Sequence, residues 1–412
     1  MRPLSGDEGA GLPLWTRWLG NVHRHRLRWD ATEGRSVTRT RAAVLRDVAK
    51  PYSLEEVELP PLVAGQVLVE VRGVGFCHTD LIGRSGLLGD QFLPAVLGHE
   101  GSGVVEAVGP GVVDLAVGDH VVLTFDSCGR CRVCRSGAPA YCVSFEQRNL
   151  SGLGDGTSAA ATDGGGRRLT SRWFGQSSFA RHAITSERNT VRVDKDVPIE
   201  LLGPLGCGVQ TGAGVVLNAM RLAPGQSVAV FGVGAVGLAA VMAAAVSGAC
   251  EIVAVEVNES RRHLALELGA TRAVDGNEAD LVAAVRGCGA GFDFSVDTTG
   301  LGQVMAVAVR VLGRPGRCVL VGAGTDTITV FPSELAGREL TYVYEGSAVP
   351  QEFIPHLVRL WRSGRFPFDR LIRQYPLDDI DRAEADAVEG RTVKPVLIPS
   401  PDGTPGARLP GS

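Results

Sequence analysis

The sequence lacks three features that would place it in common classes of protein: a membrane-length apolar run, an excess of basic charge and a secretory signal. Its most apolar window, Val228 to Val246, contains the glycine turn GVGAVG and so predicts a strand, a turn and a buried helix rather than a membrane span. The 412 residues carry a formal net charge of −4, which is no signature of nucleic-acid binding. Near the start, Arg2 and Glu8 are followed by no sustained apolar segment. We therefore expect a cytoplasmic protein with neither a nucleic-acid nor a membrane partner.

The cysteines are also unlike a disulfide framework. Their number is nine, which is odd, and without a secretory signal disulfides are not expected. Metal ligation is the first interpretation for the cysteines that cluster. Cys250, Cys288 and Cys318 lie in apolar or glycine-rich surroundings, and we interpret them as plain thiols.

The pattern of apolar residues changes along the chain, from one typical of β-strands to one of alternating strands and helices. The first predicted strand is 41–45. From residue 42 to about residue 118, short apolar or alternating pieces bounded by Gly and Pro predict a compact β-barrel-like domain. From residue 226 onward, strands alternate with helices, which predicts a βαβ series and a parallel sheet. The last strand, KPVLIP, has no place in that series and is expected to return to the first domain. The sequence therefore predicts an α/β protein of two domains.

The glycine turn is the strongest cofactor signal. GVGAVG follows the strand SVAVF directly and opens a helix, and Glu256 ends the next strand 19 residues after Gly237. This arrangement binds a dinucleotide, because the glycines let the backbone approach the pyrophosphate and the helix N-terminus offers free N–H groups. Glu256 is expected to accept the ribose hydroxyls and to repel a 2′-phosphate, so NAD is preferred to NADP. The predicted cofactor-binding residues of this motif are Gly232, Gly234, Val236, Gly237 and Glu256.

Three scattered residues are candidate metal ligands. Cys77 lies in CHTD, His99 in GHE and Cys207 in PLGCGVQTG. Taken singly, each is as readily a buried thiol or a core histidine. Brought together by folding, they would form the three-ligand site with one open position that a catalytic zinc needs.

Four further cysteines lie in one short segment, DSCGRCRVCRSGAPAYC, with the spacing C-x2-C-x2-C-x7-C. The run C-x2-C-x2-C alone also occurs at iron–sulfur clusters, but a gap of seven residues and the absence of a following Pro argue against one. A DNA-reading zinc module would need a basic helix, which is missing, and free reduced thiols remain an alternative. Four thiolates without a histidine best suit a closed tetrahedral zinc on Cys128, Cys131, Cys134 and Cys142.

Taken together, these motifs resemble the zinc-dependent medium-chain alcohol dehydrogenases, over residues 41–399. The segments HTDLIGR, FDSCGRC, FGQSSFA and PLGCGVQTGAG are most similar to the aryl-alcohol (benzyl alcohol) dehydrogenase branch. The resemblance implies a GroES-like β-barrel catalytic domain plus a Rossmann-type doubly wound parallel sheet. The implied boundaries are an N-terminal extension, expected to be mobile, at 1–40, the catalytic domain at 41–208 with its zinc lobe at 126–143, the NAD-binding domain at 209–348, a return to the catalytic domain at 349–400 and a disordered tail at 401–412.

The resemblance also implies a role for each site residue. Cys77, His99 and Cys207 would hold the catalytic zinc, with Glu100 beside it as a transient ligand, and Asp80 would orient His99. Thr79 would hydrogen-bond the substrate hydroxyl and start the proton relay. His78 and Lys394 match positions that contact the NAD pyrophosphate. The four lobe cysteines would hold a structural zinc, so two Zn²⁺ per subunit and one NAD are expected.

One residue departs from the best-known members of the family. Liver-type enzymes end their proton relay in a histidine three residues after the position of Thr79, and here that residue is Ile82. The proton is then expected to leave by another route, such as the cofactor ribose and water or a different base. Zinc would bind the alcohol as its conjugate base, and the alkoxide would deliver hydride to NAD.

The substrate is less closely specified than the chemistry. Ile82, Phe125, Trp173 and Phe174 are candidates for the pocket wall, with ordinary core packing as the alternative for each. Aromatic walls favour a primary aryl or allylic alcohol and its aldehyde. Two enzymatic alternatives stay open: a thiol-dependent, class III-like formaldehyde dehydrogenase, and a secondary-metabolism dehydrogenase with a bulkier substrate. A non-catalytic relative is a third alternative. A homodimer or homotetramer that pairs near LTYVYEG is also expected.

Overall fold

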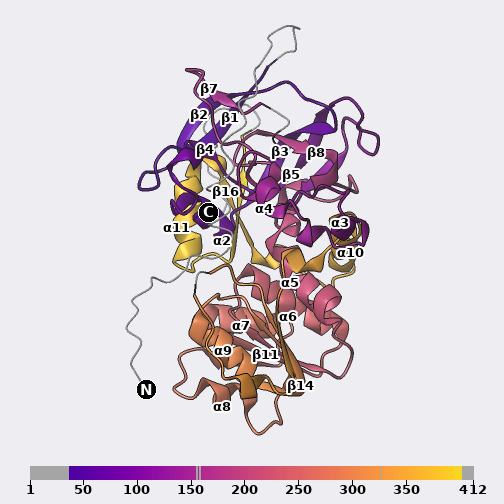
Figure 1. Cartoon of the computed structure of the whole chain (residues 1–412), viewed down its shortest axis with the longest axis vertical. Coiled ribbons are helices and arrows are strands. Elements are labelled where there is room, and N and C mark those ends of the chain that lie inside the picture. The colour runs from indigo at the N-terminus through magenta and orange to yellow at the C-terminus, as the bar shows by residue number, and fades with distance from the viewer. Residues whose placement is uncertain (1–36, 155, 157–158, 325, 401–412) are drawn as a thin grey trace, which may run out of the picture.

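The computed structural model describes residues 37–154, 156, 159–324 and 326–400. The predicted extension therefore lies outside the described residues except for 37–40, and the predicted tail, 401–412, lies outside them altogether. The first strand, β1, begins at Thr38, three residues before the predicted start. Figure 1 shows two domains stacked along the long axis of the molecule, with the earliest and latest parts of the chain together in one of them.

The first domain is built from two mainly antiparallel sheets. A four-stranded sheet has the order β4-β1-β2-β7, and a seven-stranded sheet has the order β16-β17-β3-β5-β6-β9, with β8 also paired to β3. The strands of the smaller sheet are β1 (Thr38–Leu45), β2 (Ser53–Leu59), β4 (Ala95–Val96) and β7 (Thr162–Asp163). Those of the larger sheet are β3 (Gln66–Gly75), β5 (Glu100–Val108), β6 (His120–Leu123), β8 (His182–Ser186), β9 (Thr190–Val193), β16 (Ile372–Pro376) and β17 (Lys394–Ile398).

The second domain holds a parallel six-stranded sheet in the order β12-β11-β10-β13-β14-β15. Numbered within the domain, this is the order 3-2-1-4-5-6 of a dinucleotide-binding fold, in which ligands bind where the order reverses, beside the first strand. Its strands are β10 (Ser227–Phe231), β11 (Glu251–Glu256), β12 (Arg272–Asp275), β13 (Phe292–Asp297), β14 (Leu312–Leu320) and β15 (Arg338–Tyr342). Its helices are α6 (Ala235–Ser247), α7 (Glu259–Glu267), α8 (Leu281–Arg286) and α9 (Gly302–Arg310). The predicted α/β fold class is confirmed.

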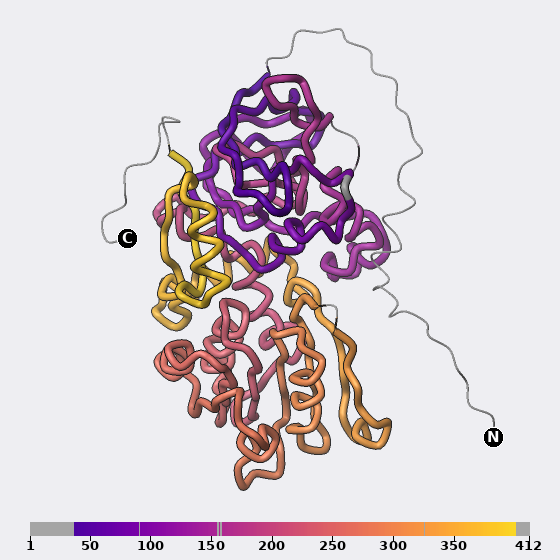
Figure 2. The backbone as a smooth tube through the Cα atoms, turned by 90° about the vertical axis from the view of Figure 1, so that its left-hand side faces the viewer, coloured from indigo at the N-terminus to yellow at the C-terminus, as the bar shows by residue number. Residues whose placement is uncertain are grey.

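Short helices and the chain's return complete the first domain. These helices are α2 (His78–Arg84), α3 (Arg132–Arg135), α4 (Phe145–Asn149), α10 (Pro350–Arg362) and α11 (Ile380–Val388), while α5 (Gly208–Gly214) connects the domains and packs mainly on α6. Strand β17 pairs antiparallel with β3, and the yellow C-terminal segment lies against the indigo N-terminal part in Figure 2. A single apolar core continues from β9 through α5 into β10, which fixes the two domains to each other.

The described part of the chain has no helix long and apolar enough to cross a membrane.

Candidate functional site

Four residues from three separate segments converge at the junction of the domains. The candidate ligand atoms of Cys77, His99, Glu100 and Cys207 all lie within 4.8 Å of one another. Cys77 precedes α2 and Cys207 precedes α5, so each thiol stands at the start of a helix, while His99 directly precedes β5. The structure therefore brings together the residues that the sequence analysis grouped as the catalytic metal site.

Asp80 fixes the orientation of the histidine. Its carboxylate is fully buried, and its Oδ1 accepts hydrogen bonds from His99 Nδ1 at 2.9 Å, from the Trp173 indole at 3.0 Å and from the Gly98 backbone at 3.1 Å. Oδ2 accepts from the Cys77 backbone N–H at 3.2 Å. With Nδ1 engaged, the other ring nitrogen, Nε2, is buried and has no hydrogen-bond partner. A buried, unpartnered nitrogen that faces two thiols is suited to a metal ion.

The chemistry of the donor set agrees with that assignment. Two thiols and an imidazole match the ligands of a catalytic zinc, which keeps one position open for substrate. The hydrogen bond from Cys207 lowers the pKa of the Cys77 thiol well below its ordinary value, and Lys394 and His99 lower it further. Burial alone lowers the pKa of His99, but Asp80 and Cys77 outweigh burial and raise it. The residues present fit a zinc ion.

Glu100 forms a buried ion pair with a lysine beside the cluster. Lys394 Nζ lies 3.0 Å from both Glu100 oxygens and donates to the Phe76 carbonyl at 3.1 Å, and both side chains are buried. Burial raises the pKa of Glu100 to about 7 although Lys394 opposes this, while Glu100 and the thiols raise the pKa of Lys394 against its own burial. Lys394, predicted to contact the pyrophosphate, thus has Glu100 as its partner here, although it also lines the site's cavity.

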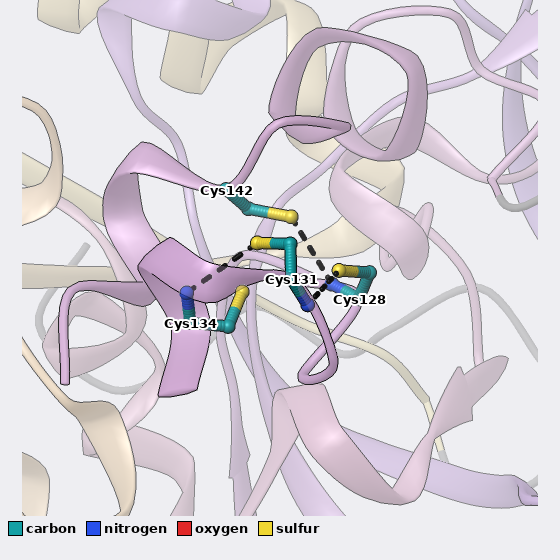
Figure 3. A group of neighbouring side chains, drawn as sticks. All are labelled: Cys128, Cys131, Cys134 and Cys142. Atoms are coloured by element: carbon teal, nitrogen blue, oxygen red, sulfur yellow. Dashed lines mark hydrogen bonds between the residues drawn. The ribbon is translucent and has the colours of Figure 1, made fainter. Parts of the chain in front are cut away.

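The other four cysteines form a separate cluster at the surface. The sulfur atoms of Cys128, Cys131, Cys134 and Cys142 lie within 4.8 Å of one another and point toward a common centre (Figure 3). No disulfide joins them. Backbone N–H groups donate to three of the sulfurs at 3.2–3.4 Å, and such bonds from Val143 and Cys134 lower the pKa of Cys131 to about 6. The arrangement fits the closed four-thiolate zinc site that the spacing predicted.

The glycine turn forms the start of α6, at the carboxyl end of β10. Gly232 has φ +79°, and a Cβ there would lie 2.6 Å from Thr298 Oγ1. A Cβ on Gly237 would lie 1.9 Å from the Gly232 carbonyl, so this glycine permits close packing of α6 on the strand. A Cβ on Gly234 would meet nothing within 4 Å, and the N-terminus of α6 has no side-chain cap. Free N–H groups and open space together suit a pyrophosphate.

Glu256 ends β11 beside this turn. Its carboxylate accepts from the Val233 N–H at 2.9 Å and from the Asn258 N–H at 3.0 Å. Arg261 lies nearby on α7, and its Nε is buried without a hydrogen-bond partner. These two side chains, one acidic and one basic, both line the cavity on the side of the glycine turn.

One cavity of about 720 Å³ joins the metal cluster to the glycine turn. Its wall includes the predicted residues Cys77, His78, Thr79, Cys207, Gly232, Gly234, Val236, Glu256 and Lys394. The Cys77 thiol donates to Thr79 Oγ1 at 3.8 Å, which places the Thr79 hydroxyl beside the metal cluster.

The four predicted substrate-pocket residues divide into two pairs. Ile82 and Phe174 line the cavity. Phe125 and Trp173 are not among the described residues that line it, because both lie behind the wall: Phe125 packs against Phe145, and Trp173 is fully buried with its indole on Asp80. Trp173 thus contacts the carboxylate that orients His99 rather than the pocket.

Sequence reasoning missed several side chains that reach the cavity. They are Phe145, Thr298, Tyr344 and Glu345, with Arg261 on the cofactor side. Thr298 and Glu345 follow the carboxyl ends of β13 and β15 closely, which is the edge where parallel sheets bind ligands. That rule, applied to every strand of the series, was the signal available for finding both.

Comparison with known proteins agrees with a zinc site beside a dinucleotide-binding domain. Residues 63–195 match the alcohol dehydrogenase GroES-like domain family, and residues 235–361 match the zinc-binding dehydrogenase family. The chain is 45% identical to a geraniol dehydrogenase of Castellaniella defragrans over 87% of its own length and 97% of that protein. It is 33% identical to an S-(hydroxymethyl)glutathione dehydrogenase of Komagataella pastoris over 89% of its length and 99% of the relative.

A solved structure of similar sequence has the same fold. The chain superposes on the benzyl alcohol dehydrogenase of Acinetobacter calcoaceticus with a TM-score of 0.83 at 43% identity, covering 88% of this chain and 100% of that one. Two family models that match in order, full-length relatives and the convergent cysteines and histidine point to one conclusion. The chain belongs to the zinc-dependent medium-chain alcohol dehydrogenase family.

Proposed function

We propose that the protein is a zinc- and NAD-dependent alcohol dehydrogenase that interconverts a primary aryl or allylic alcohol and its aldehyde. The observation that carries the proposal is the single cavity in which the Cys77–His99–Cys207 cluster faces the glycine turn of a dinucleotide fold. Hydride transfer needs an alcohol carbon and a nicotinamide in contact, and this cavity is where the two would meet.

Each residue of the cluster has a task in this proposal. Cys77, His99 and Cys207 hold the zinc ion, which when bound lowers the pKa of an alcohol hydroxyl, while NAD supplies the hydride acceptor. Asp80 keeps His99 Nε2 directed at the ion. Glu100, a candidate transient ligand, is retained on Lys394. The four lobe cysteines hold a second, structural zinc, so that two zinc ions are expected per chain.

Thr79 receives the hydroxyl proton of the substrate. Its Oγ1 lies beside the Cys77 thiol on the cavity wall. Ile82, one turn further along α2, also lines the cavity and has no group that takes up a proton. The proton would therefore leave Thr79 by a route other than α2, such as the ribose of a bound cofactor and water or a different base.

Glu256 and the glycine turn make NAD the preferred cofactor. A carboxylate at the end of the second strand accepts ribose hydroxyls and repels a 2′-phosphate. His78, exposed at the start of α2, and Lys394 both line the cavity and are the proposed pyrophosphate contacts. The ratio of kcat/KM for NAD and NADP tests this assignment, and a ratio below one would contradict it.

The substrate end of the cavity is apolar and aromatic. Its wall includes Ile82, Leu88, Leu150 and Phe174 together with a stacked pair, Phe145 and Tyr344, whose ring centroids are 5.4 Å apart. Flat or extended unsaturated carbon chains gain dispersion and stacking energy on such a surface. This wall supports an aryl or allylic substrate, and it leaves room for the alternative of a bulkier biosynthetic alcohol.

The charges along the cavity do not favour the thiol-adduct alternative. A glutathione adduct carries carboxylates, which need cationic partners. Among the described residues, the only Lys and Arg side chains that line the cavity are Lys394, engaged with Glu100, and Arg261, on the cofactor side. Glu146 lies at the substrate end instead.

A substrate panel tests the proposal as a whole. Benzyl, cinnamyl, geranyl and short aliphatic alcohols are assayed with NAD and NADP on zinc-replete protein, each with and without glutathione or mycothiol. We expect NAD-linked turnover that needs no thiol and is fastest for an aryl or allylic alcohol. Fastest turnover of ethanol would contradict the aryl and allylic assignment, and a strict thiol requirement would favour the formaldehyde dehydrogenase alternative.

We also propose that two or four copies associate through β15. This strand is at the edge of the six-stranded sheet within the described chain, and an unpaired edge can pair with its copy across a two-fold axis. Light scattering of the purified protein tests the proposal, and a monomer at micromolar concentration would contradict it.

A further inference from the structure

The turn that follows β15 has an unusual backbone conformation. Glu345, Gly346 and Ser347 have φ values of 49°, 61° and 51°. The left-handed region is costly for residues with a Cβ, so a glutamate and a serine adopt it only where their surroundings determine it. This segment is called here the Glu345 turn. Its contacts with the rest of the protein must fix its backbone conformation and, with it, the direction of the Glu345 side chain.

Three contacts from two separate parts of the protein hold the Glu345 turn. A Cβ on Gly346 would lie 2.8 Å from Gly214 Cα, so the turn packs backbone against backbone on α5. Asn218 donates to the Gly346 carbonyl at 3.2 Å. The Ser347 hydroxyl is 2.8 Å from the Tyr141 hydroxyl of the cysteine lobe.

The side chain that the turn presents points at the metal cluster. Glu345 is buried, and its Oε1 lies 3.9 Å from Cys207 Sγ, which donates to it, while its Oε2 accepts from the Gln210 amide at 3.4 Å. Gln210 in turn donates to the Gly206 carbonyl at 2.6 Å. The carboxylate thus contacts both the Cys207 side chain and the residue that secures the loop before it.

The Glu345 side chain makes only weak contacts with the described part of the chain. Within the described chain, no lysine or arginine forms an ion pair with it, and its two hydrogen bonds are long. A buried carboxylate is normally paired or close to a metal ion. A metal ion held by Cys77, His99 and Cys207 would lie beside this carboxylate.

We propose that Glu345 is a positioning residue of the catalytic metal centre, which fixes Cys207 in its ligand geometry from the dinucleotide-binding side. The inference rests on the metal site assigned under the proposed function. It adds a residue that ties the last strand of the cofactor domain to a metal ligand of the catalytic domain. Gln210 supports the carboxylate, and Tyr141 and Asn218 support the turn.

Cobalt substitution tests the inference without relying on turnover. The catalytic and lobe sites of the full chain are loaded with Co²⁺, and thiolate-to-metal absorption and affinity against a chelator are measured for wild type, Glu345→Ala and Glu345→Gln. Mutation of a residue that contacts a metal ligand typically weakens metal affinity by about 10- to 100-fold. We expect Glu345→Ala to weaken the catalytic site within that range and to shift its absorption, with the lobe unchanged. Glu345→Gln should keep more affinity, because it retains an oxygen that accepts from the Gln210 amide and gains an amide that can donate to a deprotonated Cys207, while its absorption still shifts.

The matched control is Glu339→Gln, on β15, the strand that precedes the Glu345 turn. Glu339 pairs with Arg317 at the surface, with its side chain 67% exposed, so its metal affinity and spectrum should equal those of wild type. Wild-type affinity and an unshifted spectrum in Glu345→Gln would overturn the inference, even if Glu345→Ala fails to fold. Equal losses at the lobe and the catalytic site would also overturn it, because they indicate general destabilisation.

A separate variant distinguishes this failure from failure of the proposed function. Cys77→Ser should remove one metal ion from the wild-type background. If Cys77→Ser retains both metal ions, the metal site itself is misassigned. If Cys77→Ser loses one ion and the Glu345 variants match wild type, only the role of Glu345 is refuted.

Discussion

Asp80→Asn is the substitution that most clearly separates orientation of the metal ligand from ligation itself. Asp80 touches no predicted substrate or cofactor atom, yet four donors converge on its buried carboxylate. Asparagine has nearly the same shape but carries no charge and has only one acceptor oxygen. If that oxygen replaces Oδ1, the amide group faces the Cys77 N–H as a second donor.

The size of the effect follows from those contacts. The amide keeps three hydrogen bonds in weaker, uncharged form and leaves the Cys77 N–H unpaired, which costs about 1–3 kcal/mol in a buried site. Loosening His99 should weaken zinc binding by about 10- to 100-fold, which corresponds to about 1.4–2.7 kcal/mol. Both effects are large for a side chain that ligates nothing.

The assay is zinc affinity by chelator competition, combined with kcat/KM for the best alcohol of the panel. Trp173→Phe is the control, because it removes one donor to Asp80 and keeps an aromatic ring in the core. We expect the control to lie within about threefold of wild-type zinc affinity, since the other donors to Asp80 remain. If Asp80→Asn matches wild type in both zinc affinity and kcat/KM, the orienting role of Asp80 is refuted.

Three further predictions address the lobe, the buried ion pair and a surface cluster. Cys131→Ser should lower thermal stability or disrupt assembly, and it should lower activity only as a consequence of that loss. A stable, assembled but inactive variant would contradict the separation of the two metal sites. Lys394→Met should lower the free energy of unfolding in urea by about 3–5 kcal/mol, because it leaves the Glu100 charge buried without its cation. The double variant Lys394→Met with Glu100→Gln should recover part of that free energy. No recovery in the double variant would argue against the ion pair. Arg46 lowers the pKa of Glu55 below its ordinary 4.5 through a hydrogen bond, so this pair stabilises the fold above that pH and ceases to do so as the pH falls through the lowered value. The stability difference between wild type and Arg46→Met should therefore shrink in acid, and a difference that does not change with pH would contradict the assignment.

The cofactor half of the molecule follows closely from local sequence. The turn GVGAVG lies between a strand and a helix, and the acid that ends the next strand adjoins it, so neighbours in sequence are neighbours in the fold. Periodicity also indicates the alternating strands and helices of the parallel sheet. This is why the α/β fold class could be predicted before any coordinates.

The metal site depends on contacts that no local pattern encodes. Cys77 and Cys207 are 130 residues apart in the chain, so ligand chemistry and the resemblance to a family grouped them, and no local pattern did. The partners around them are as distant: Trp173 lies 93 residues from Asp80, and Lys394 lies 294 residues from Glu100. The sequence suggested a pocket aromatic at Trp173 and a phosphate contact at Lys394. Their placement beside the metal ligands depends on how the two sheets pack.

The metal content of Cys77→Ser, measured with its NAD-linked turnover, tests the central claim most directly. The claim is that Cys77, His99 and Cys207 hold the working ion and that the four-cysteine lobe holds a separate one. We predict two zinc ions per wild-type chain, and one zinc ion with turnover abolished in a folded Cys77→Ser variant. Full NAD-linked activity in a Cys77→Ser variant that has lost one zinc ion would contradict the claim.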